Sequence, residues 1–249
     1  MGGAIFNQGD VSITNSTLTG NKAVGDTNGR GLGGGVFNHN GTIQVSVSTL
    51  SLNTAAQGGR GIYNRDDSAT LAAVARINNS IIAQTDTTVE DFTATGGGLP
   101  TGQGNLIGTQ SGFTGSYITG DPKLGLLQNN SGRTPTMALA ADSPAVNMGT
   151  GEPRPSFDQR GKPRSIGDLA VDIGAFELRK PQTINFAALG NRTYGDADFA
   201  ITATATSTLP VIFTASGNAT VQQVAGVWNV HITGAGSATI TASQTGNDD

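Results

Sequence analysis

The sequence predicts an all-β protein, on three observations. The phrase Gly2–Asn7 returns at Gly33–Asn38 and, weakened, at Gly59–Asn64. A repeat spaced by about 30 residues indicates stacked structural units. The first 90 residues contain no stretch of eleven residues with good helical periodicity, and the last part of the chain alternates apolar and polar residues with a period of two. Both patterns favour strands over helices.

A second phrase travels with the first. Ser16–Asn21 recurs at Ser48–Asn53 and, more loosely, at Ser80–Thr85, with an offset of 32 residues each time. The apolar residues in both phrases are brief runs of β-branched or aromatic residues between Gly, Asn, Asp and Ser, which is typical of strands. Short parallel strands on such a period form a solenoid, and parallel crossovers are right-handed. We therefore expect the C-terminal coils of a right-handed parallel β-helix over residues 1–120.

One asparagine recurs at a turn of each phrase, and we expect these residues to stack. An amide side chain can donate to the coil on one side and accept from the coil on the other. The alternative is that they point outward and bind sugar or calcium. The residues are Asn7, Asn38, Asn64, Asn21 and Asn53.

Residues 121–180 change character, with six prolines and six lysines or arginines from position 122 to position 164. An open solenoid end needs a cap that satisfies its edge. We expect a capping segment here, fixed by buried ion pairs of Asp158 with Arg160 and of Asp172 with Arg160 or Arg164. The alternative for these residues is an active site built from carboxylates and arginine.

Residues 181–249 predict an immunoglobulin-like β-sandwich. In Trp228–Thr233 and in Ala238–Ser243 the apolar residues take one face and the polar residues the other, and glycines separate the runs. Alternating strands of this length indicate an antiparallel sandwich. The chain has no cysteine, so the likeness to immunoglobulin domains is architectural.

Composition narrows the range of partners. The formal net charge is −4, with a pI near 5, so the chain offers no basic face for nucleic acid. No apolar run of 18 residues exists, and we expect no membrane span in this chain. No secretory signal precedes the first repeat, and the sequence opens inside a repeat phrase. We therefore expect a fragment of a longer protein, truncated at the C-terminus as well.

Three resemblances to bacterial surface proteins follow the same division. The first part resembles the β-helix of polymorphic outer-membrane proteins, whose GGAI motif stands at Gly2–Ile5, although leucine replaces phenylalanine in the FxxN motif. On the residues Leu189–Asp196, Leu209–Val211 and Gly234–Ala242, the last part looks like bacterial Ig-like repeats. The middle part resembles the choice-of-anchor Q domain of secreted proteins, on the motifs Asp121–Leu127, Gly132–Thr136, Ser143–Asn147, Asp158–Arg164 and Asp172–Glu177. These resemblances imply a location outside the cell or on the bacterial surface.

A search for chemistry finds no motif that predicts catalysis. Asp66 and Asp67 beside Arg65 occupy a turn whose sister coils also carry turn residues. Asp86, Glu90 and Asp91 form an acidic loop that we expect to be solvated. His39 and His231 lie near no nucleophile motif. The segment Arg192–Asp198 could donate two carboxylates to calcium, but this is too few ligands. We predict no catalytic, cofactor-binding or metal-binding residue.

The expected function is therefore that of a non-enzymatic surface protein, an adhesin or a structural stalk. Its expected partners are surface glycans or proteins of a host or neighbouring cell, without nucleic acid. One alternative is a polysaccharide-degrading, pectate-lyase-like enzyme whose catalytic coils lie upstream of Met1. Another is a pure spacer that positions a different domain.

Overall fold

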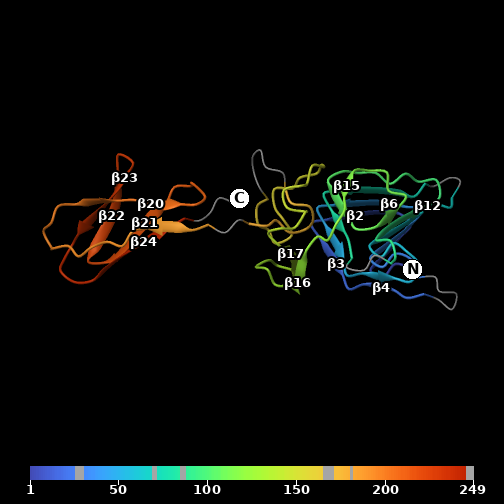
Figure 1. The fold of residues 1–249 in the computed structure, drawn as a ribbon, viewed down its shortest axis with the longest axis horizontal. Helices are drawn as coiled ribbons and strands as arrows, with labels where there is room; N and C mark the ends of the chain where they lie inside the picture. The colour runs from blue at the N-terminus through green and yellow to red at the C-terminus, as the bar shows by residue number, and fades with distance from the viewer. Residues whose placement is uncertain (26–30, 69–71, 85–87, 165–170, 180–181, 245–249) are drawn as a thin grey trace. The chain divides into compact units, whose positions relative to one another are not determined.

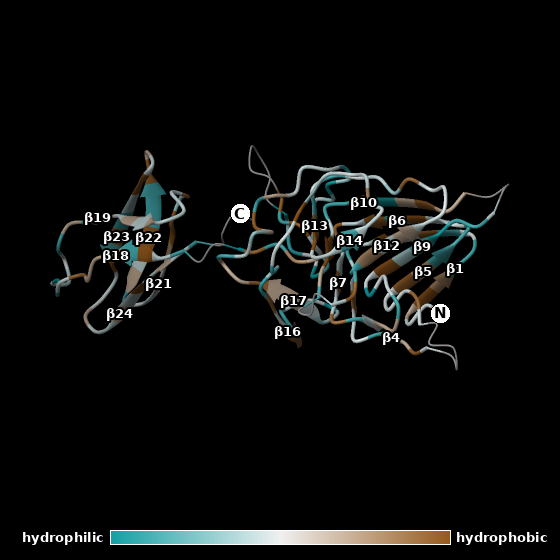
Figure 2. Cartoon of the chain, turned by 45° about the vertical axis from the view of Figure 1, so that its right-hand side comes forward, coloured by the Kyte–Doolittle hydropathy of each residue, from teal (hydrophilic) through white to brown (hydrophobic). Residues whose placement is uncertain are grey.

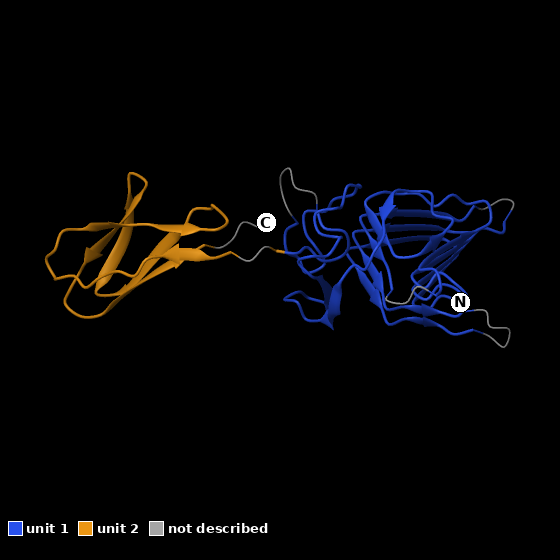
Figure 3. Cartoon of the chain, viewed as in Figure 1, with its two compact units in different colours: residues 1–178, 248 blue, residues 179–247, 249 orange. Residues whose placement is uncertain are grey.

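The computed structural model describes residues 1–25, 31–68, 72–84, 88–164, 171–179 and 182–244 (Figure 1). The described residues form strands, turns and loops and contain no helix, so the prediction of an all-β protein with parallel sheets is confirmed. They accordingly hold no helix able to cross a membrane. The chain divides into two compact units, one of residues 1–178 and one of residues 179–247, and each is described by itself (Figure 3).

Unit 1 is built on three parallel sheets; the first three turns of the chain add one strand to each, and the next two turns add strands to the first and third sheets. The first sheet contains, in spatial order, β1 (Ile5–Asn7), β5 (Val36–His39), β9 (Ile62–Arg65), β12 (Phe92–Thr95) and β14 (Gln110–Ser111). The second contains β2 (Asp10–Thr14), β6 (Thr42–Ser46) and β10 (Val74–Asn78). The third contains β3 (Thr17–Thr19), β7 (Thr49–Ser51), β11 (Ile81–Ile82), β13 (Asn105–Ile107) and β15 (Tyr117–Ile118). A short parallel pair, β4 (Lys22–Ala23) with β8 (Thr54–Ala55), lies beside them.

The repeated phrases stack in register. Ile5 of β1 pairs with Val36 of β5, which pairs in turn with Ile62 of β9. These strands lie side by side in Figure 2. Because the same positions stack in every turn, apolar side chains from all three sheets meet inside in one continuous core. That core contains Ile13, Val36, Ile43, Val45, Leu50, Ile62, Ala75, Ile77, Ile82, Phe92, Ile107 and Phe113.

The paired glycines of the first phrase lie where consecutive turns approach closely. A Cβ on Gly3 would lie 2.1 Å from the carbonyl oxygen of Gly34. A Cβ on Gly34 would lie 2.4 Å from the carbonyl oxygen of Arg60 in the following turn. No side chain fits at these distances, so the glycine repeat is a packing requirement of the stack.

A left-handed backbone corner joins the second sheet to the third in each of the first three turns. Its residues are Asn15, Val47 and Asn79, with φ values of 46°, 44° and 48°. Asparagine tolerates this conformation, whereas it is strained for a β-branched valine. Val47 is fully buried, so packing holds its strained backbone in place.

Residues 121–178 belong to unit 1 and share its second hydrophobic cluster. The antiparallel hairpin of β16 (Leu124–Gln128) and β17 (Thr136–Leu139) opens this segment. Leu139, Ala145 and Ile173 pack with Ile81 and Leu106 of the parallel turns. The segment is therefore part of the same core, not a separate body.

The later part of this segment also runs alongside the turns. We call residues 149–164 and 171–178 the return segment. Gly174 N–H donates to the carbonyl of Asn79, Ala175 N–H donates to the Thr49 hydroxyl, and Thr17 bonds Gln159. The three partners belong to three successive turns. The return segment therefore covers the corner of the stack, whereas the sequence predicted a cap over its open end.

Unit 2 consists of antiparallel strands. The three-stranded sheet has β23 (Val227–Ile232) between β19 (Phe199–Ile201) and β22 (Ala219–Val224). Two pairs accompany it, β18 (Ile184–Phe186) with β20 (Ala203–Ala205) and β21 (Ile212–Gly217) with β24 (Ala238–Ser243). Its core is small, with Ile201, Phe213, Ala219 and Val230 buried.

Candidate functional site

The asparagines of the first phrase bond one another across three turns. Asn7 Nδ2 donates to Asn38 Oδ1 at 2.7 Å, and Asn38 Nδ2 donates to Asn64 Oδ1 at 2.7 Å. Each Nδ2 also donates to a nearby backbone carbonyl. These buried amides therefore bond both the neighbouring asparagine and the backbone around them. Such a buried row holds the coils in register and presents no amide to a ligand.

The second phrase behaves in the same way and extends further than its asparagines. Asn21 Nδ2 donates to Asn53 Oδ1 at 2.9 Å, and the Asn53 backbone N–H donates to Gln84 Oε1 at 2.7 Å. A serine row runs beside it, in which the backbone N–H of Ser16 bonds the Ser48 hydroxyl and that of Ser48 bonds the Ser80 hydroxyl. The sequence analysis missed this row, although the common 32-residue offset of the serines was its signal.

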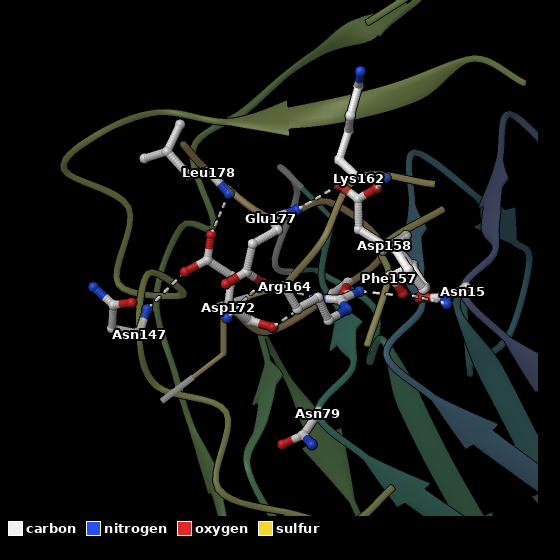
Figure 4. Close-up of polar contacts among 12 residues, drawn as sticks. Asn15, Asn79, Asn147, Phe157, Asp158, Lys162, Arg164, Asp172, Glu177 and Leu178 are labelled. Atoms are coloured by element: carbon white, nitrogen blue, oxygen red, sulfur yellow. Dashed lines mark hydrogen bonds and ion pairs between the residues drawn. The ribbon is translucent and has the colours of Figure 1, made fainter. Parts of the chain in front are cut away.

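A buried arginine joins the return segment to the first turn. Arg164 is 1% exposed, and its Nη1 lies 3.0 Å from Glu177 Oε2. Its Nη2 donates to Gly174 O at 2.8 Å and to Asn15 Oδ1 at 3.0 Å. Figure 4 shows the guanidinium between Glu177 and the Asn15 corner. The sequence analysis expected Asp172 as a partner of Arg160 or Arg164, but the ion pair of Arg164 is with Glu177.

Asp158 and Arg160 form the other predicted pair. Arg160 Nη2 and Asp158 Oδ2 lie 2.7 Å apart, and both side chains are almost fully covered. Asp158 also accepts the backbone N–H groups of Lys162 and Glu177. Arg160 lies flat over the Phe176 ring, 3.6 Å from its centroid, a cation–π contact.

The side chain of Asp172 accepts hydrogen bonds from the backbone. Its two carboxylate oxygens accept the N–H groups of Asn147 and Leu178, at 2.8 and 2.5 Å. Burial raises its pKa, and these two hydrogen bonds act against that rise. The carboxylates and arginines of this network are engaged with each other and with the backbone, which is the arrangement of a structural clamp.

A further buried ion pair contradicts one prediction. Asp91, expected in a solvated loop, is 1% exposed and lies 3.3 Å from Arg60 Nη2. Its other oxygen accepts the N–H and hydroxyl of Thr109. Desolvation by burial raises the pKa of Asp91 to about 6. Of its sequence neighbours, Glu90 is exposed, and Asp86 lies outside the described residues.

On the outer face of the first sheet, aromatic residues stack in register. Phe6 pairs with Phe37 and Phe37 with Tyr63, one from each of β1, β5 and β9. We call these three the aromatic row. Ring centroids are 5.6 Å apart for Phe6 and Phe37 and 5.7 Å apart for Phe37 and Tyr63. Phe6 is 48% exposed, so the row reaches the surface.

Beside the aromatic row lies a group of polar residues that we call the polar cluster: His39, Asn40, Arg65 and Asp67. Asp67 Oδ1 accepts from His39 Nε2 and Asn40 Nδ2, both at 2.8 Å, and Asp67 Oδ2 lies 2.9 Å from Arg65 Nε. A carboxylate only accepts, so His39 Nε2 carries the proton, and His39 Nδ1 accepts from the Gln8 amide at 3.1 Å. The hydrogen bonds from Asn40 and His39 lower the pKa of Asp67.

A groove of about 480 Å³ is bordered by Phe37 of the aromatic row and by three members of the polar cluster. Its lining includes apolar surface from Val24, Leu32 and Phe37, and polar surface from His39, Arg65 and Asp67. The volume lies within the range of about 300–1,000 Å³ for small-ligand sites. The sequence alone predicts that Asp66, Asp67 and His39 are separate turn residues. Only folding brings His39 and Asp67, 28 residues apart, into contact.

Unit 2 carries a similar pair on its exposed surface. His231 Nδ1 lies 2.7 Å from Asp198 Oδ1, with the two side chains 57% and 45% exposed. In the segment considered for calcium, Asp196 Oδ2 accepts the Thr193 N–H, which closes a turn. Among the described residues, no group of three or more histidine, aspartate or glutamate side chains is placed to hold a metal.

Comparison with known proteins adds no relative. A scan against protein-family models, a search of curated proteins and a search of solved structures each found no match to this chain.

Proposed function

We propose that this chain is a non-enzymatic, extracellular or surface protein of bacteria, an adhesin-like stalk. In this proposal unit 1 is a right-handed parallel β-helix with a choice-of-anchor Q-like return segment, and unit 2 is a bacterial Ig-like sandwich. Surface glycans or proteins of a neighbouring cell are its proposed partners.

The observation that carries the proposal is the use of buried polar residues within unit 1. The asparagine and serine rows bond turn to turn, and the carboxylates of the return segment bond arginines and backbone N–H groups. Glycoside hydrolysis needs two accessible carboxylates on either side of the scissile bond. Asp158 and Glu177, in contrast, are 3% and 3% exposed and hold the fold together. A stack of this kind supplies a rigid, repetitive surface, which suits a stalk that presents a binding face.

The test is a binding assay paired with an activity assay on the same protein. We expect the chain to be retained by a glycan array while releasing no reducing ends or unsaturated products from pectin or alginate. Product release by this chain, lost on heat denaturation, would overturn the non-enzymatic proposal. Absence of binding to every immobilised glycan and to intact bacterial and host cells would favour the spacer alternative.

A further inference from the structure

The groove beside the aromatic row carries an inference that deepens the proposed function and rests on it. We propose that this groove binds a neutral oligosaccharide, with pyranose rings lying against its apolar floor and hydroxyl groups bonded to the polar cluster.

The floor of the groove supplies the apolar part of such a site. Val24 is 67% exposed and gives the lining open apolar surface, whereas Phe37 and Leu32, 1% and 7% exposed, lie beneath it. The ring of His39 stacks on that of Phe37, with centroids 5.8 Å apart and planes inclined by 11°. A pyranose has flat faces of C–H groups, and aromatic and apolar surfaces of this kind offer it contact area with little entropy to lose.

The rim supplies planar polar groups in pairs. A carboxylate, a guanidinium and an imidazole stand within one hydrogen-bonded cluster, so the rim holds both acceptors and donors. Neighbouring hydroxyl groups of a sugar each donate and accept, and they match such a rim. Because Asn40, Gln8 and Arg65 already hold His39 and Asp67 in place, binding loses little side-chain freedom.

The paired charges at the rim of the groove disfavour charged ligands. Arg65 and Asp67 lie 2.9 Å apart, so their charges offset each other at the rim. A uronate or sialic acid would meet the Asp67 carboxylate, and a glucosamine ammonium group would meet the Arg65 guanidinium. A neutral sugar carries no charge and is repelled by neither Asp67 nor Arg65. The asparagine rows lie inside the stack and leave this outer face to the ligand.

The experiment is calorimetric titration of the full chain with cellohexaose, mannohexaose and xylohexaose, beside oligogalacturonate and deacetylated chitohexaose. We expect at least one neutral oligosaccharide to bind and the two charged ones to bind more weakly. Asp67→Ala and His39→Ala should each weaken that binding about tenfold, because each removes polar contacts and loosens the cluster. Both side chains are partly exposed, and Arg65→Gln provides a third variant that leaves the core untouched.

The matched control is the equivalent histidine–aspartate pair of unit 2. Asp198→Ala and His231→Ala break an exposed pair of nearly the same length and should leave affinity unchanged. If none of the neutral oligosaccharides binds, if a charged one binds best, or if the Asp67 and Arg65 variants bind like the parent protein, the inference is wrong. If the chain releases products from a polysaccharide and the variants still bind the oligosaccharide more weakly, the non-enzymatic function is wrong but the proposed site stands. If glycans bind the His39, Arg65 and Asp67 variants as tightly as the parent protein, the proposed function stands and the proposed site is wrong.

Discussion

The two units of this protein bury different kinds of side chain. All of the buried polar and charged residues among the described ones lie in unit 1, whereas unit 2 buries only apolar side chains. Those of unit 2 are Ile201, Ala205, Phe213, Ala219 and Val230. Unit 1 therefore combines a large apolar core with buried polar pairs, and unit 2 depends on apolar area alone.

This difference predicts different responses to mutation. Removing one member of a buried polar pair leaves the other desolvated without a partner, which costs more than the pair contributes. Removing apolar bulk costs transfer energy and leaves a cavity. The sole tryptophan, Trp228, lies in β23, so its fluorescence follows unit 2, while circular dichroism follows both units.

The largest expected effect is that of Arg164→Leu. The substitution takes the Arg164 guanidinium away from the buried Glu177 carboxylate and breaks the bonds of Arg164 to Gly174 and Asn15. We expect the free energy of unfolding of unit 1 to fall by about 3–5 kcal/mol. Urea unfolding followed by circular dichroism measures this loss. The unfolding transition of unit 2, followed by Trp228 fluorescence, should not change.

Its control is Arg154→Ala. Arg154 lies 3.6 Å from Glu152, and both side chains are well exposed, so the change should stay below about 1 kcal/mol. Equal losses in the two arginine variants would show that Arg164 is no more than a surface charge.

Phe213→Ala should have the next largest effect, confined to unit 2. Phe213 packs against Phe186 and Trp228, with centroid distances of 5.2 and 5.7 Å. Loss of the ring from so small a core should cost about 3 kcal/mol, measured by Trp228 fluorescence in urea. Thr214→Ala, one residue further on the exposed face, is the control. A parallel shift of the unit 1 transition would contradict the separation of the two units.

Asn38→Ala tests the asparagine row from its centre. Asn38 bonds Asn7, Asn64 and the carbonyl of Gly41, and all of these groups would lose a partner inside the stack. We expect unit 1 to lose about 2–3 kcal/mol in the same urea experiment. Asn229→Ala, whose side chain bonds only the carbonyl of Val227 at the surface of unit 2, should change stability by less than about 0.5 kcal/mol. If the two variants were equally stable, the row would not hold the turns.

The smallest expected effect is the pH dependence from Asp91. Its pKa is about 6 in the folded protein, above the ordinary value of 3.8. Between these values the native state binds more protons than the unfolded chain, so the unfolding free energy falls as pH rises through about 6. Between about pH 4 and about pH 7 a shift of this size should change the unfolding free energy by about 2 kcal/mol.

Asp172 shifts in the same direction, so the measurement needs a difference. Unfolding curves of the parent and of Asp91→Asn, recorded from about pH 4 to about pH 7, isolate the contribution of this one carboxyl. A parent protein that gains stability relative to the variant as pH rises would reverse the predicted sign.

The repeats allowed much of unit 1 to be predicted. The offset of 31 residues between the first two copies of the opening phrase is the register that pairs Ile5 with Val36, and the offset of 32 is the one that pairs Leu18 with Leu50. A period is visible in sequence because stacked positions share one environment and so carry one residue type. The all-β class, the parallel sheets and the stacked asparagine positions follow from that constraint.

The tertiary structure alone decided which unlike residues meet. Arg164 and Asn15 stand 149 residues apart, and His39 meets Asp67 across adjacent turns. Glu177 replaces Asp172 as the ion partner of Arg164, and Asp91 is buried against Arg60. These contacts are made once, where the return segment crosses the corner or where a turn breaks the repeat. Each depends on how the whole chain packs, so no local pattern or period in the sequence marks it.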